Sequence, residues 1–322
     1  MGLYKRLSPK GKPEPKENLE FSKATTSLYK RLTPKEITFV VNEIKKQRKP
    51  LKGFFEKIER AQRGEEIEIP KKKPVSRWVK TGVKGFDELF EKGIPRGSSI
   101  LLAGGAGSGK TILGLQLLNY YASTGEKCFY MSFEESDTHL IEHMESFGWD
   151  VKKLIKENNL IIKRFNPFDI TRSVDALLMK EKGELLIDVE PIIFPENFKP
   201  SFIVVDSLTA IASAFTGKEE NYRIYIEQIF RLFEKLKITS FLIAETEQVP
   251  KIFSQSGVEE FLADGVIVLY NIQRGNIRES AIEVLKLRGA KHQKKIVAMQ
   301  VTEKGIVVYP EQEVFGRVKE NE

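Results

Sequence analysis

The feature that most constrains this chain is the stretch Gly104-Gly105-Ala106-Gly107-Ser108-Gly109-Lys110-Thr111. It fits G-x-x-x-x-G-K-[ST], the pattern of a phosphate-binding loop. Glycines let such a loop turn tightly and direct its backbone N–H groups at phosphate oxygens. The lysine, here Lys110, can reach the β- and γ-phosphates, and the Thr111 hydroxyl can bind Mg²⁺. The stretch therefore predicts a site for a nucleotide phosphate chain and its magnesium ion.

The residues around this loop match the setting that the motif requires. Residues 98–103 (Ser-Ser-Ile-Leu-Leu-Ala) predict a buried strand, and residues 112–118 (Ile-Leu-Gly-Leu-Gln-Leu-Leu) predict a helix. A phosphate-binding loop joins a strand to a helix in this order. The alternative is a glycine-rich turn without a ligand, which this context weakens. A dinucleotide fingerprint is excluded because the last glycine of G-x-G-x-x-G would fall at Lys110.

An aspartate follows a fully apolar strand further along the chain. Residues 202–205 (Phe-Ile-Val-Val) lead directly into Asp206. A continuous apolar run of this kind suits the centre of a parallel sheet that is covered on both faces. In NTPases with this loop, an aspartate at such a position holds Mg²⁺. Many strands end in aspartate, but in combination with the loop Asp206 becomes, with Thr111, a candidate magnesium ligand.

Two glutamates follow the strand predicted over residues 127–133. Glu134 and Glu135 come at its carboxyl end, and in an open α/β sheet that end borders the ligand crevice. A carboxylate there can orient or deprotonate an attacking water molecule. The structural alternative is that the two acids begin the next helix and interact with its dipole. Both interpretations can hold, since only one carboxylate need face the γ-phosphate.

Two further patterns have a chemical and a structural interpretation. Residues 139–143 (His-Leu-Ile-Glu-His) match H-x-x-E-H, a metalloprotease pattern. His292 is the third and last histidine of the chain, so surface or half-buried histidines are favoured over a metal site.

Lys286 and Arg288 lie two residues apart on one side of a predicted strand. They either meet phosphate oxygens or form the solvated face of an edge strand.

The order of elements predicts an α/β fold over residues 76–310. After the loop, strands alternate with helices expected at 137–147, 170–181 and 222–236, and residues 183–200 are expected to form an irregular insertion. The chain then closes on strands alone, at 265–270, 282–287, 296–301 and 306–309. This order predicts a mostly parallel sheet flanked by helices and extended by antiparallel strands at its C-terminal end. Residues 311–322 are expected to form a C-terminal tail.

Residues 1–75 differ in charge from the rest of the chain. They contain 20 Lys and Arg against 10 Asp and Glu. Since the whole chain carries +7 and this segment carries +10, the remainder carries −3. The octamer at residues 3–10 returns at 28–35, and two short helices are expected after it. We expect a partly disordered basic extension that is either a solvated tail or a docking element for a protein partner or a nucleic acid.

Composition bears on the compartment. No apolar run reaches the roughly 18 residues that a membrane-spanning helix needs, and the residues after Met1 lack the apolar segment of a signal peptide. The single cysteine, Cys128, leaves no partner for an internal disulfide. We therefore expect a cytoplasmic protein without membrane insertion.

Taken together, the stretches at 81–97, 104–111, 132–136, 146–150, 204–207, 257–261 and 285–292 resemble the KaiC family of RecA-like ATPases over residues 76–310. The resemblance implies a RecA-like core that assembles as a homo-hexameric ring with ATP between subunits. It implies that Glu134 and Glu135 are the catalytic glutamates. It also implies that Lys286, Arg288 and His292 of one subunit reach the nucleotide of its neighbour.

Departures from the family pattern limit what the resemblance implies. The clock protein KaiC carries two such domains, whereas this chain carries one and is more similar to stand-alone archaeal members. The autophosphorylated half of KaiC has an adjacent Ser-Thr pair, and residues 218–223 (Lys-Glu-Glu-Asn-Tyr-Arg) contain none. We therefore expect ATP hydrolysis and no clock function. A Ser/Thr autokinase and an ATP-controlled module that binds nucleic acid or recruits a partner stay open as alternatives.

Overall fold

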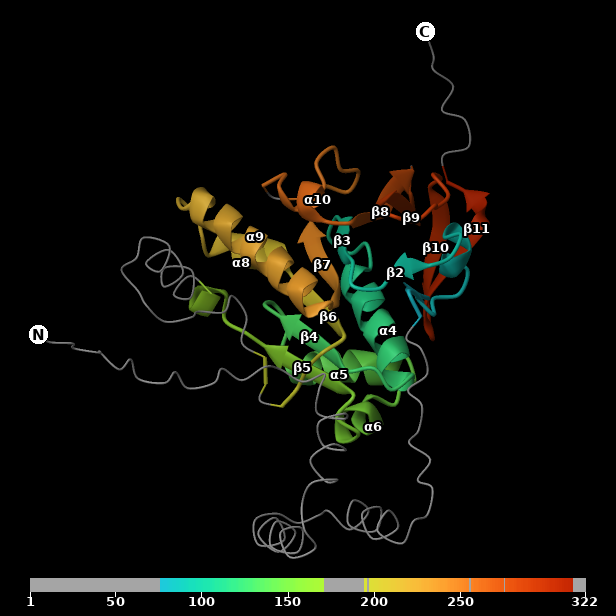
Figure 1. The fold of residues 1–322 in the computed structure, drawn as a ribbon. Helices are drawn as coiled ribbons and strands as arrows, with labels where there is room; N and C mark the ends of the chain where they lie inside the picture. Colours follow the sequence, from blue (N-terminus) through green and yellow to red (C-terminus); the bar gives the residue numbers. More distant parts are fainter. Residues whose placement is uncertain (1–75, 171–193, 196, 255, 275, 315–322) are drawn as a thin grey trace, which may run out of the picture. The chain divides into compact units, whose positions relative to one another are not determined.

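The computed structural model describes residues 76–314 except 171–193, 196, 255 and 275 (Figure 1). The basic extension at 1–75, its repeated octamer, the C-terminal tail from residue 315 and nearly all of the helix expected at 170–181 lie outside the described residues, as does most of the insertion expected at 183–200. Among the described residues, no helix combines the length and the apolar character that a membrane crossing needs.

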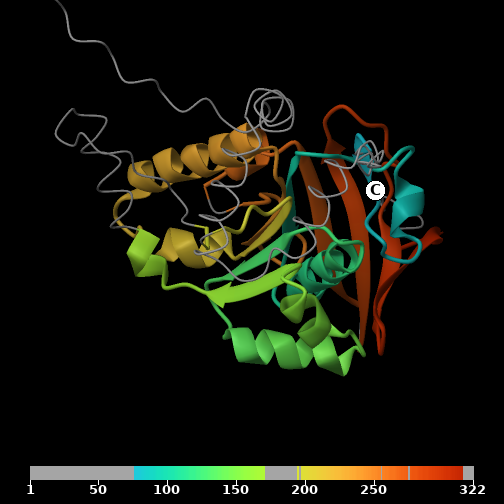
Figure 2. The same ribbon diagram turned by 60° about the horizontal axis from the view of Figure 1, so that its bottom comes forward.

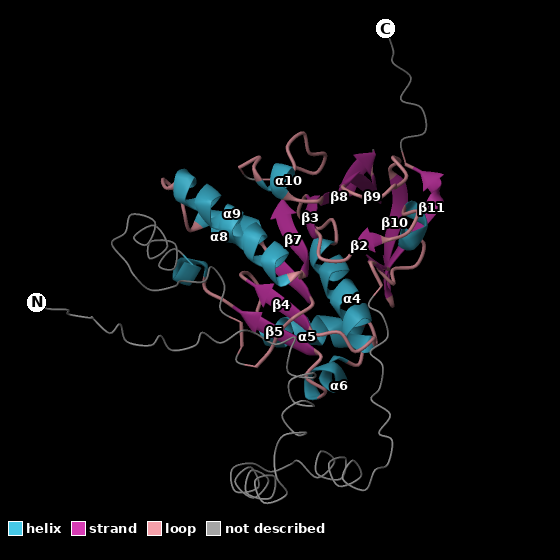
Figure 3. Ribbon diagram, viewed as in Figure 1, coloured by secondary structure: helices cyan, strands magenta, loops and turns pink. Residues whose placement is uncertain are grey.

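A nine-stranded sheet organises the described residues, in the spatial order β11-β10-β9-β8-β3-β7-β6-β4-β5 (Figure 3). From β8 to β5 all neighbouring strands are parallel. These parallel strands are β3 (Ser99–Gly104), β4 (Cys128–Ser132), β5 (Leu160–Arg164), β6 (Phe202–Asp206), β7 (Thr239–Glu245) and β8 (Gly265–Arg274). Four of them, β3, β4, β6 and β7, are almost entirely buried, as the apolar runs in the sequence predict.

The last three strands run antiparallel and extend the sheet beyond β8. They are β9 (Ile277–Leu287), β10 (Val297–Thr302) and β11 (Gly305–Glu313), each paired with the strand before it. This arrangement confirms the α/β fold with an antiparallel C-terminal end. A separate two-stranded sheet joins β1 (Trp78–Val79) to β2 (Ile94–Pro95), and the short 3₁₀ helix η1 (Phe86–Leu89) lies between these two strands in the chain.

Helices cover both faces of the parallel sheet, as the view in Figure 2 shows. The first face packs against α4 (Lys110–Ser123), α5 (Asp137–Ser146) and α6 (Val151–Lys156), and the second against α8 (Leu208–Ser213), α9 (Glu219–Leu236) and the short α10 (Glu259–Leu262). Alternation along β3 divides the core, because Ile100 and Leu102 join the first cluster while Leu101 joins the second. The sequence did not indicate α6 or α8.

The parallel register aligns the carboxyl ends of four strands. Gly104 at the end of β3 pairs with Glu245 at the end of β7, and Ser132 at the end of β4 pairs with Asp206 at the end of β6. Side chains and loops that follow these positions must therefore share one edge of the sheet. That edge is the one at which open α/β sheets bind their ligands.

Candidate functional site

The loop between β3 and α4 has the close packing and the backbone conformations that its glycines permit. Gly107 and Gly109 have positive φ angles of 71° and 95°, which residues with a Cβ rarely adopt. Gly104 has no such angle, but a Cβ there would lie 2.4 Å from the backbone oxygen of Leu269 on β8. Gly107 and Gly109 are thus needed for their positive φ angles, and Gly104 is needed because β8 lies too close for a side chain.

Lys110 is the first residue of α4, and its buried side chain is directed back into the loop. Its Nζ donates a hydrogen bond of 2.9 Å to the backbone oxygen of Gly105. Burial lowers the pKa of the Lys110 amine, and the negative charges of Glu245, Asp206 and Glu134 oppose that shift, in this order of size. The ammonium group is therefore surrounded by acceptors within a partly desolvated cavity.

Asp206, at the end of β6, accepts two hydrogen bonds on one oxygen. Thr111 Oγ1 donates to Oδ2 at 2.8 Å, and the Tyr130 hydroxyl donates to the same atom at 2.6 Å. Burial raises the pKa of this carboxyl to about 6, and the two hydrogen bonds counteract the shift. The pair that the sequence predicts as magnesium ligands, Thr111 and Asp206, is thus in direct contact.

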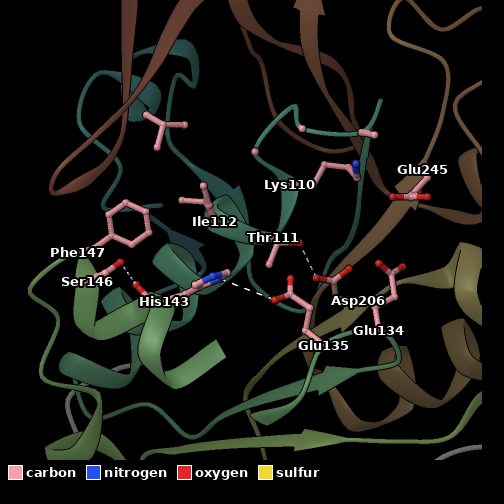
Figure 4. Close-up of a pocket in the computed structure, with 14 residues that line it drawn as sticks. Lys110, Thr111, Ile112, Glu134, Glu135, His143, Ser146, Phe147, Asp206 and Glu245 are labelled. Carbon is pink, nitrogen blue, oxygen red and sulfur yellow. Dashed lines mark hydrogen bonds and ion pairs between the residues drawn. The ribbon is translucent and has the colours of Figure 1, made fainter. Parts of the chain in front are cut away.

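Glu134 and Glu135 follow β4 and turn in different directions. Glu134 Oε1 accepts a hydrogen bond of 2.5 Å from the hydroxyl of Ser207. The backbone oxygen of Glu135 accepts one of 2.6 Å from the hydroxyl of Ser132, while its side chain approaches α5. Both carboxylates lie beside Asp206 and below Lys110 in Figure 4.

These groups line one cavity of about 520 Å³. Figure 4 shows carboxylates at its base, with Ile112 and Phe147 towards its other side. The lining residues are Ala106, Gly107, Gly109, Lys110, Thr111, Ile112, Glu134, Glu135, His143, Ser146, Phe147, Asp206, Glu245 and Val301. The cavity thus brings together the loop, Asp206 and both glutamates from the ends of three strands.

The donor set fits a nucleotide phosphate chain with Mg²⁺. Lys110 Nζ has one hydrogen-bond partner within the loop, the backbone oxygen of Gly105, and lines the cavity with the loop backbone at Gly107 and Gly109. A Cβ at Gly105 would come within 2.9 Å of the Gln248 backbone and side chain, so a larger residue would crowd the cradle. Thr111 and Asp206 offer the oxygen ligands that Mg²⁺ prefers.

The structure places Lys286 and Arg288 away from this cavity. Lys286 Nζ donates to the backbone oxygens of Glu260 at 2.9 Å and Ala263 at 2.7 Å. Arg288 donates to the oxygen of Phe261 at 2.8 Å. The two cations therefore hold the carboxyl end of α10, which is an intrachain role.

His292 also lies outside the cavity lining. It forms an isolated antiparallel bridge with Phe90 beyond the end of β9. Neither ring nitrogen has a hydrogen-bond partner among the described residues. Within one chain, His292 is therefore not brought together with the phosphate loop.

Sequence reasoning missed three residues of the site. Glu245 lines the cavity directly after an apolar strand, the same pattern that indicated Asp206. Tyr130 contacts Asp206 from the neighbouring strand, and Gln248 Nε2 donates to the backbone oxygen of Ala106 at 3.0 Å. Glu245, the acid that ends β7, could have been found from its pattern. Tyr130 and Gln248 carry no local indication of their role.

Comparison with known families gives one match that spans most of the chain. The family model for the ATPase KaiC matches residues 79–313. The matched range begins at the second residue of β1 and ends with β11, so it includes the whole nine-stranded sheet. It also includes the whole cavity lining.

Individual relatives agree with this match. The circadian clock oscillator protein KaiC of Rippkaea orientalis is 32% identical over 245 residues, which are 73% of this chain and 44% of that protein. KaiC 1 of Synechocystis is 30% identical over 243 residues. The chain therefore spans less than half the length of these curated relatives.

A solved structure is matched over nearly its whole length. The crystal structure of a KaiC-like protein from the hyperthermophilic archaeon Pyrococcus horikoshii superimposes with a TM-score of 0.59 and 31% identity. The match covers 73% of this chain and 99% of that one. At this identity and TM-score, the matched part of this chain has the same fold as that KaiC-like protein.

Proposed function

The chain belongs to the KaiC family of ATPases, and from this we propose that it binds ATP with Mg²⁺ and hydrolyses the ATP at the subunit interfaces of a ring. The observation that carries the proposal is the convergence of Lys110, Thr111, Asp206 and the two glutamates on one cavity. Each of these residue types has a separate task in the hydrolysis of a phosphoanhydride.

Lys110 and the loop are proposed to bind the phosphates. Backbone N–H groups of the loop would contact phosphate oxygens, and the Lys110 ammonium would leave the oxygen of Gly105 for the β- and γ-phosphates. Thr111 and Asp206 would hold Mg²⁺, which when bound neutralises negative charge on the phosphates. Asp206 would bind through its carboxylate, already oriented by Tyr130.

Glu134 is proposed as the principal residue that orients the attacking water molecule. Its charge interacts with both Lys110 and Asp206, which supports a position close to the phosphates. Ser207 holds one carboxylate oxygen, so the other can accept a proton from water. Glu135 is proposed to support this role from the other side of Asp206.

A protein kinase would need a hydroxyl in place of that water. The hydroxyl in contact with Glu134 is that of Ser207, which is fully buried and also accepts a hydrogen bond from the Ala210 N–H at the start of α8. The Ser207 hydroxyl would have to leave these contacts to receive a phosphoryl group, whereas a water molecule would not, and this difference favours hydrolysis.

Incubation with γ-labelled ATP and Mg²⁺ separates the two activities. We expect label mainly in free phosphate, and stoichiometric label on the protein would overturn the hydrolase assignment.

Two variants test the assigned roles. Lys110→Ala is expected to abolish nucleotide binding. The double variant Glu134→Gln with Glu135→Gln is expected to bind ATP without turning it over. Wild-type turnover in the double variant would exclude the catalytic assignment. The single variants then rank the two glutamates, with the larger rate loss expected for Glu134→Gln.

A mixing experiment tests catalysis across a subunit interface. The double glutamate variant keeps Arg288, and Arg288→Ala keeps both glutamates. If Arg288 acts on the nucleotide of a neighbour, mixed rings contain some interfaces with both functional halves. We expect hydrolysis in the mixture above that of either variant alone. No recovery, with both variants assembled, would restrict Lys286 and Arg288 to their contacts with α10.

A nucleic-acid-binding role is the second candidate, and the +10 charge of residues 1–75 favours it. Phosphate contacts by Lys and Arg make affinity fall steeply with salt. Under this candidate, DNA binding by the full chain would be salt-dependent and would weaken on deletion of residues 1–75. Unchanged, salt-insensitive binding after the deletion would exclude the extension as the contact surface.

A further inference from the structure

A cluster of three ligand-type side chains lies beside the nucleotide cavity. Glu135, which follows β4, and His139 and His143, on successive turns of α5, bring one oxygen and two ring nitrogens within 4.8 Å of one another. The chain has three histidines and one cysteine in all, and Cys128 is buried elsewhere. Two of its three imidazoles are therefore concentrated in this cluster.

The geometry within the cluster is close. His139 Nδ1 lies 2.8 Å and His143 Nδ1 3.9 Å from Glu135 Oε2. The two imidazole rings lie with their centroids 4.2 Å apart. Figure 4 shows His143 directed from α5 towards Glu135. In both imidazoles, Nδ1 is thus the atom that approaches the same carboxylate oxygen.

These contacts are not ordinary hydrogen bonds. Glu135 Oε2 is buried and has no hydrogen-bond partner among the described residues, although His139 Nδ1 is 2.8 Å away. An imidazole N–H lies in the ring plane, so this oxygen lies off its axis. An off-axis approach of oxygen and nitrogen is expected when their lone pairs are directed at a third atom between them.

The backbone around the cluster holds its members in place. The hydroxyl of Ser132 binds the backbone oxygen of Glu135 at 2.6 Å. Ser136 caps α5, its hydroxyl accepting the backbone N–H of His139 at 3.2 Å. His139 and His143 are four residues apart, so they share one helix face. The three ligand atoms already lie within 4.8 Å of one another. The side chains of His139 and His143 are 54% and 44% exposed, so both imidazoles have room to rotate towards a shared ion.

We propose that Glu135, His139 and His143 form a binding site for a divalent transition-metal ion of the Zn²⁺ class. Three protein ligands of imidazole and carboxylate type, with the remaining position open to solvent, are the donor set of such ions. Imidazole nitrogen is a poor ligand for Mg²⁺, which prefers oxygen. The site is therefore chemically separate from the proposed magnesium ligands Thr111 and Asp206.

The sequence pattern alone points to a different set. H-x-x-E-H would pair the two histidines with Glu142, but that side chain is exposed and is not a member of the cluster. The carboxylate of the cluster comes instead from Glu135, which lies in the connection between β4 and α5. Glu142→Gln is therefore a matched control, because it removes a carboxylate from the same helix without removing a proposed ligand.

The test is a titration of the untagged full-length protein with Co²⁺ and with Zn²⁺, without nucleotide. Co²⁺ should give visible absorption bands typical of nitrogen and oxygen ligation, which Zn²⁺ should abolish by competition. His139→Gln and His143→Gln should each weaken metal binding about tenfold or more, since even the loss of a partner that orients a ligand has an effect of that size. Circular dichroism melting checks that each variant is folded.

The outcomes separate clearly. Tight binding in the wild type and in Glu142→Gln, with loss in both histidine variants and in Glu135→Gln, supports the site. Binding that is unchanged in the histidine variants overturns it. A loss in Glu142→Gln equal to that in His139→Gln also overturns it, because the sequence motif would then be the true ligand set.

One consequence rests on the proposed function. An ion on Glu135 would remove that carboxylate from the nucleotide cavity, so micromolar Zn²⁺ should slow Mg²⁺-dependent hydrolysis in the wild type. In His139→Gln the inhibition, measured against that variant's own rate without zinc, should weaken in proportion to the lost affinity. The Co²⁺ spectrum is recorded without ATP, so failure of the metal site and failure of the hydrolase assignment are distinguishable.

Discussion

The Tyr130 hydroxyl donates a 2.6 Å hydrogen bond to Oδ2 of Asp206, the same atom that accepts the Thr111 hydroxyl at 2.8 Å. The two donors come from β4 and from the first turn of α4, so one oxygen joins a neighbouring strand to the helix of the phosphate loop. Asp206 is buried, and this contact orients it before any ligand arrives.

Tyr130→Phe should destabilise the fold through the loss of one hydrogen bond to a buried carboxylate. Bonds to charged groups contribute about 1.5–3 kcal/mol, and we expect a loss of that size in the free energy of unfolding at pH 8. Urea titration followed by circular dichroism measures it. Tyr121→Phe is the control, since the Tyr121 hydroxyl is buried with no hydrogen-bond partner among the described residues. If both variants lost the same free energy of unfolding, the hydrogen bond from Tyr130 to Asp206 would not be the cause of the loss.

Asp206→Asn should stabilise the ligand-free protein at neutral pH. Burial raises the folded pKa of Asp206 from 3.8 to about 6. A folded pKa above the unfolded one means that the folded state binds more protons between these values, so the free energy of unfolding falls as pH rises through this window and stays low above it. A shift of this size corresponds to about 3 kcal/mol.

The asparagine variant lacks this penalty because its amide does not ionise. Without Mg²⁺ and nucleotide, we expect its stability advantage to be full above pH 6 and to vanish below pH 3.8. Urea titrations across this range measure the difference. Added Mg²⁺ and ATP should stabilise the wild type but not the variant. A variant less stable than the wild type at pH 8 would show that the charged carboxylate is well compensated.

Gly104→Ala should reduce both stability and nucleotide affinity. The added Cβ would lie 2.4 Å from the backbone oxygen of Leu269, which cannot move without shifting β8. Overpacking of this kind costs about 1–3 kcal/mol, and the displaced loop should lower ATP affinity. Gly217→Ala is the control, because its Cβ would meet open space at a φ of 75°. It should cost about 1 kcal/mol of stability and leave ATP affinity unchanged. Fluorescent nucleotide titration distinguishes the two.

Lys286→Met should loosen α10 while it preserves the apolar stem of the side chain. The ammonium donates to the backbone oxygens of Glu260 and Ala263, and loss of both bonds should cost about 1–3 kcal/mol. Hydrogen exchange of residues 259–263 should therefore accelerate. Lys291→Met, at an exposed position, is the control. Unchanged exchange in Lys286→Met would show that the carbonyls find other donors.

Several features could be predicted because their causes lie close together in the chain. The loop at 104–111 combines backbone conformation, charge and a hydroxyl within eight consecutive residues, and its flanking strand and helix follow from local periodicity. The buried strands β3 and β6 follow from apolar runs, and the antiparallel end follows from strands without intervening helices. By contrast, α8 is too short to show a clear helical period in the sequence, and the histidine pattern at 139–143 does not include Glu135, which the fold places beside both histidines.

The sequence by itself determined the phosphate loop, the apolar strand that ends in Asp206, the glutamates after β4 and the order of elements, because each depends on neighbouring residues. Only the tertiary structure decided which distant residues meet them. The spatial order β3-β7-β6-β4 places Glu245 opposite Gly104, and Tyr130 beside Asp206. Successive turns of α5 bring two histidines to Glu135. Strand order is set by the packing of both sheet faces against helices, and that depends on contacts between residues far apart in the chain.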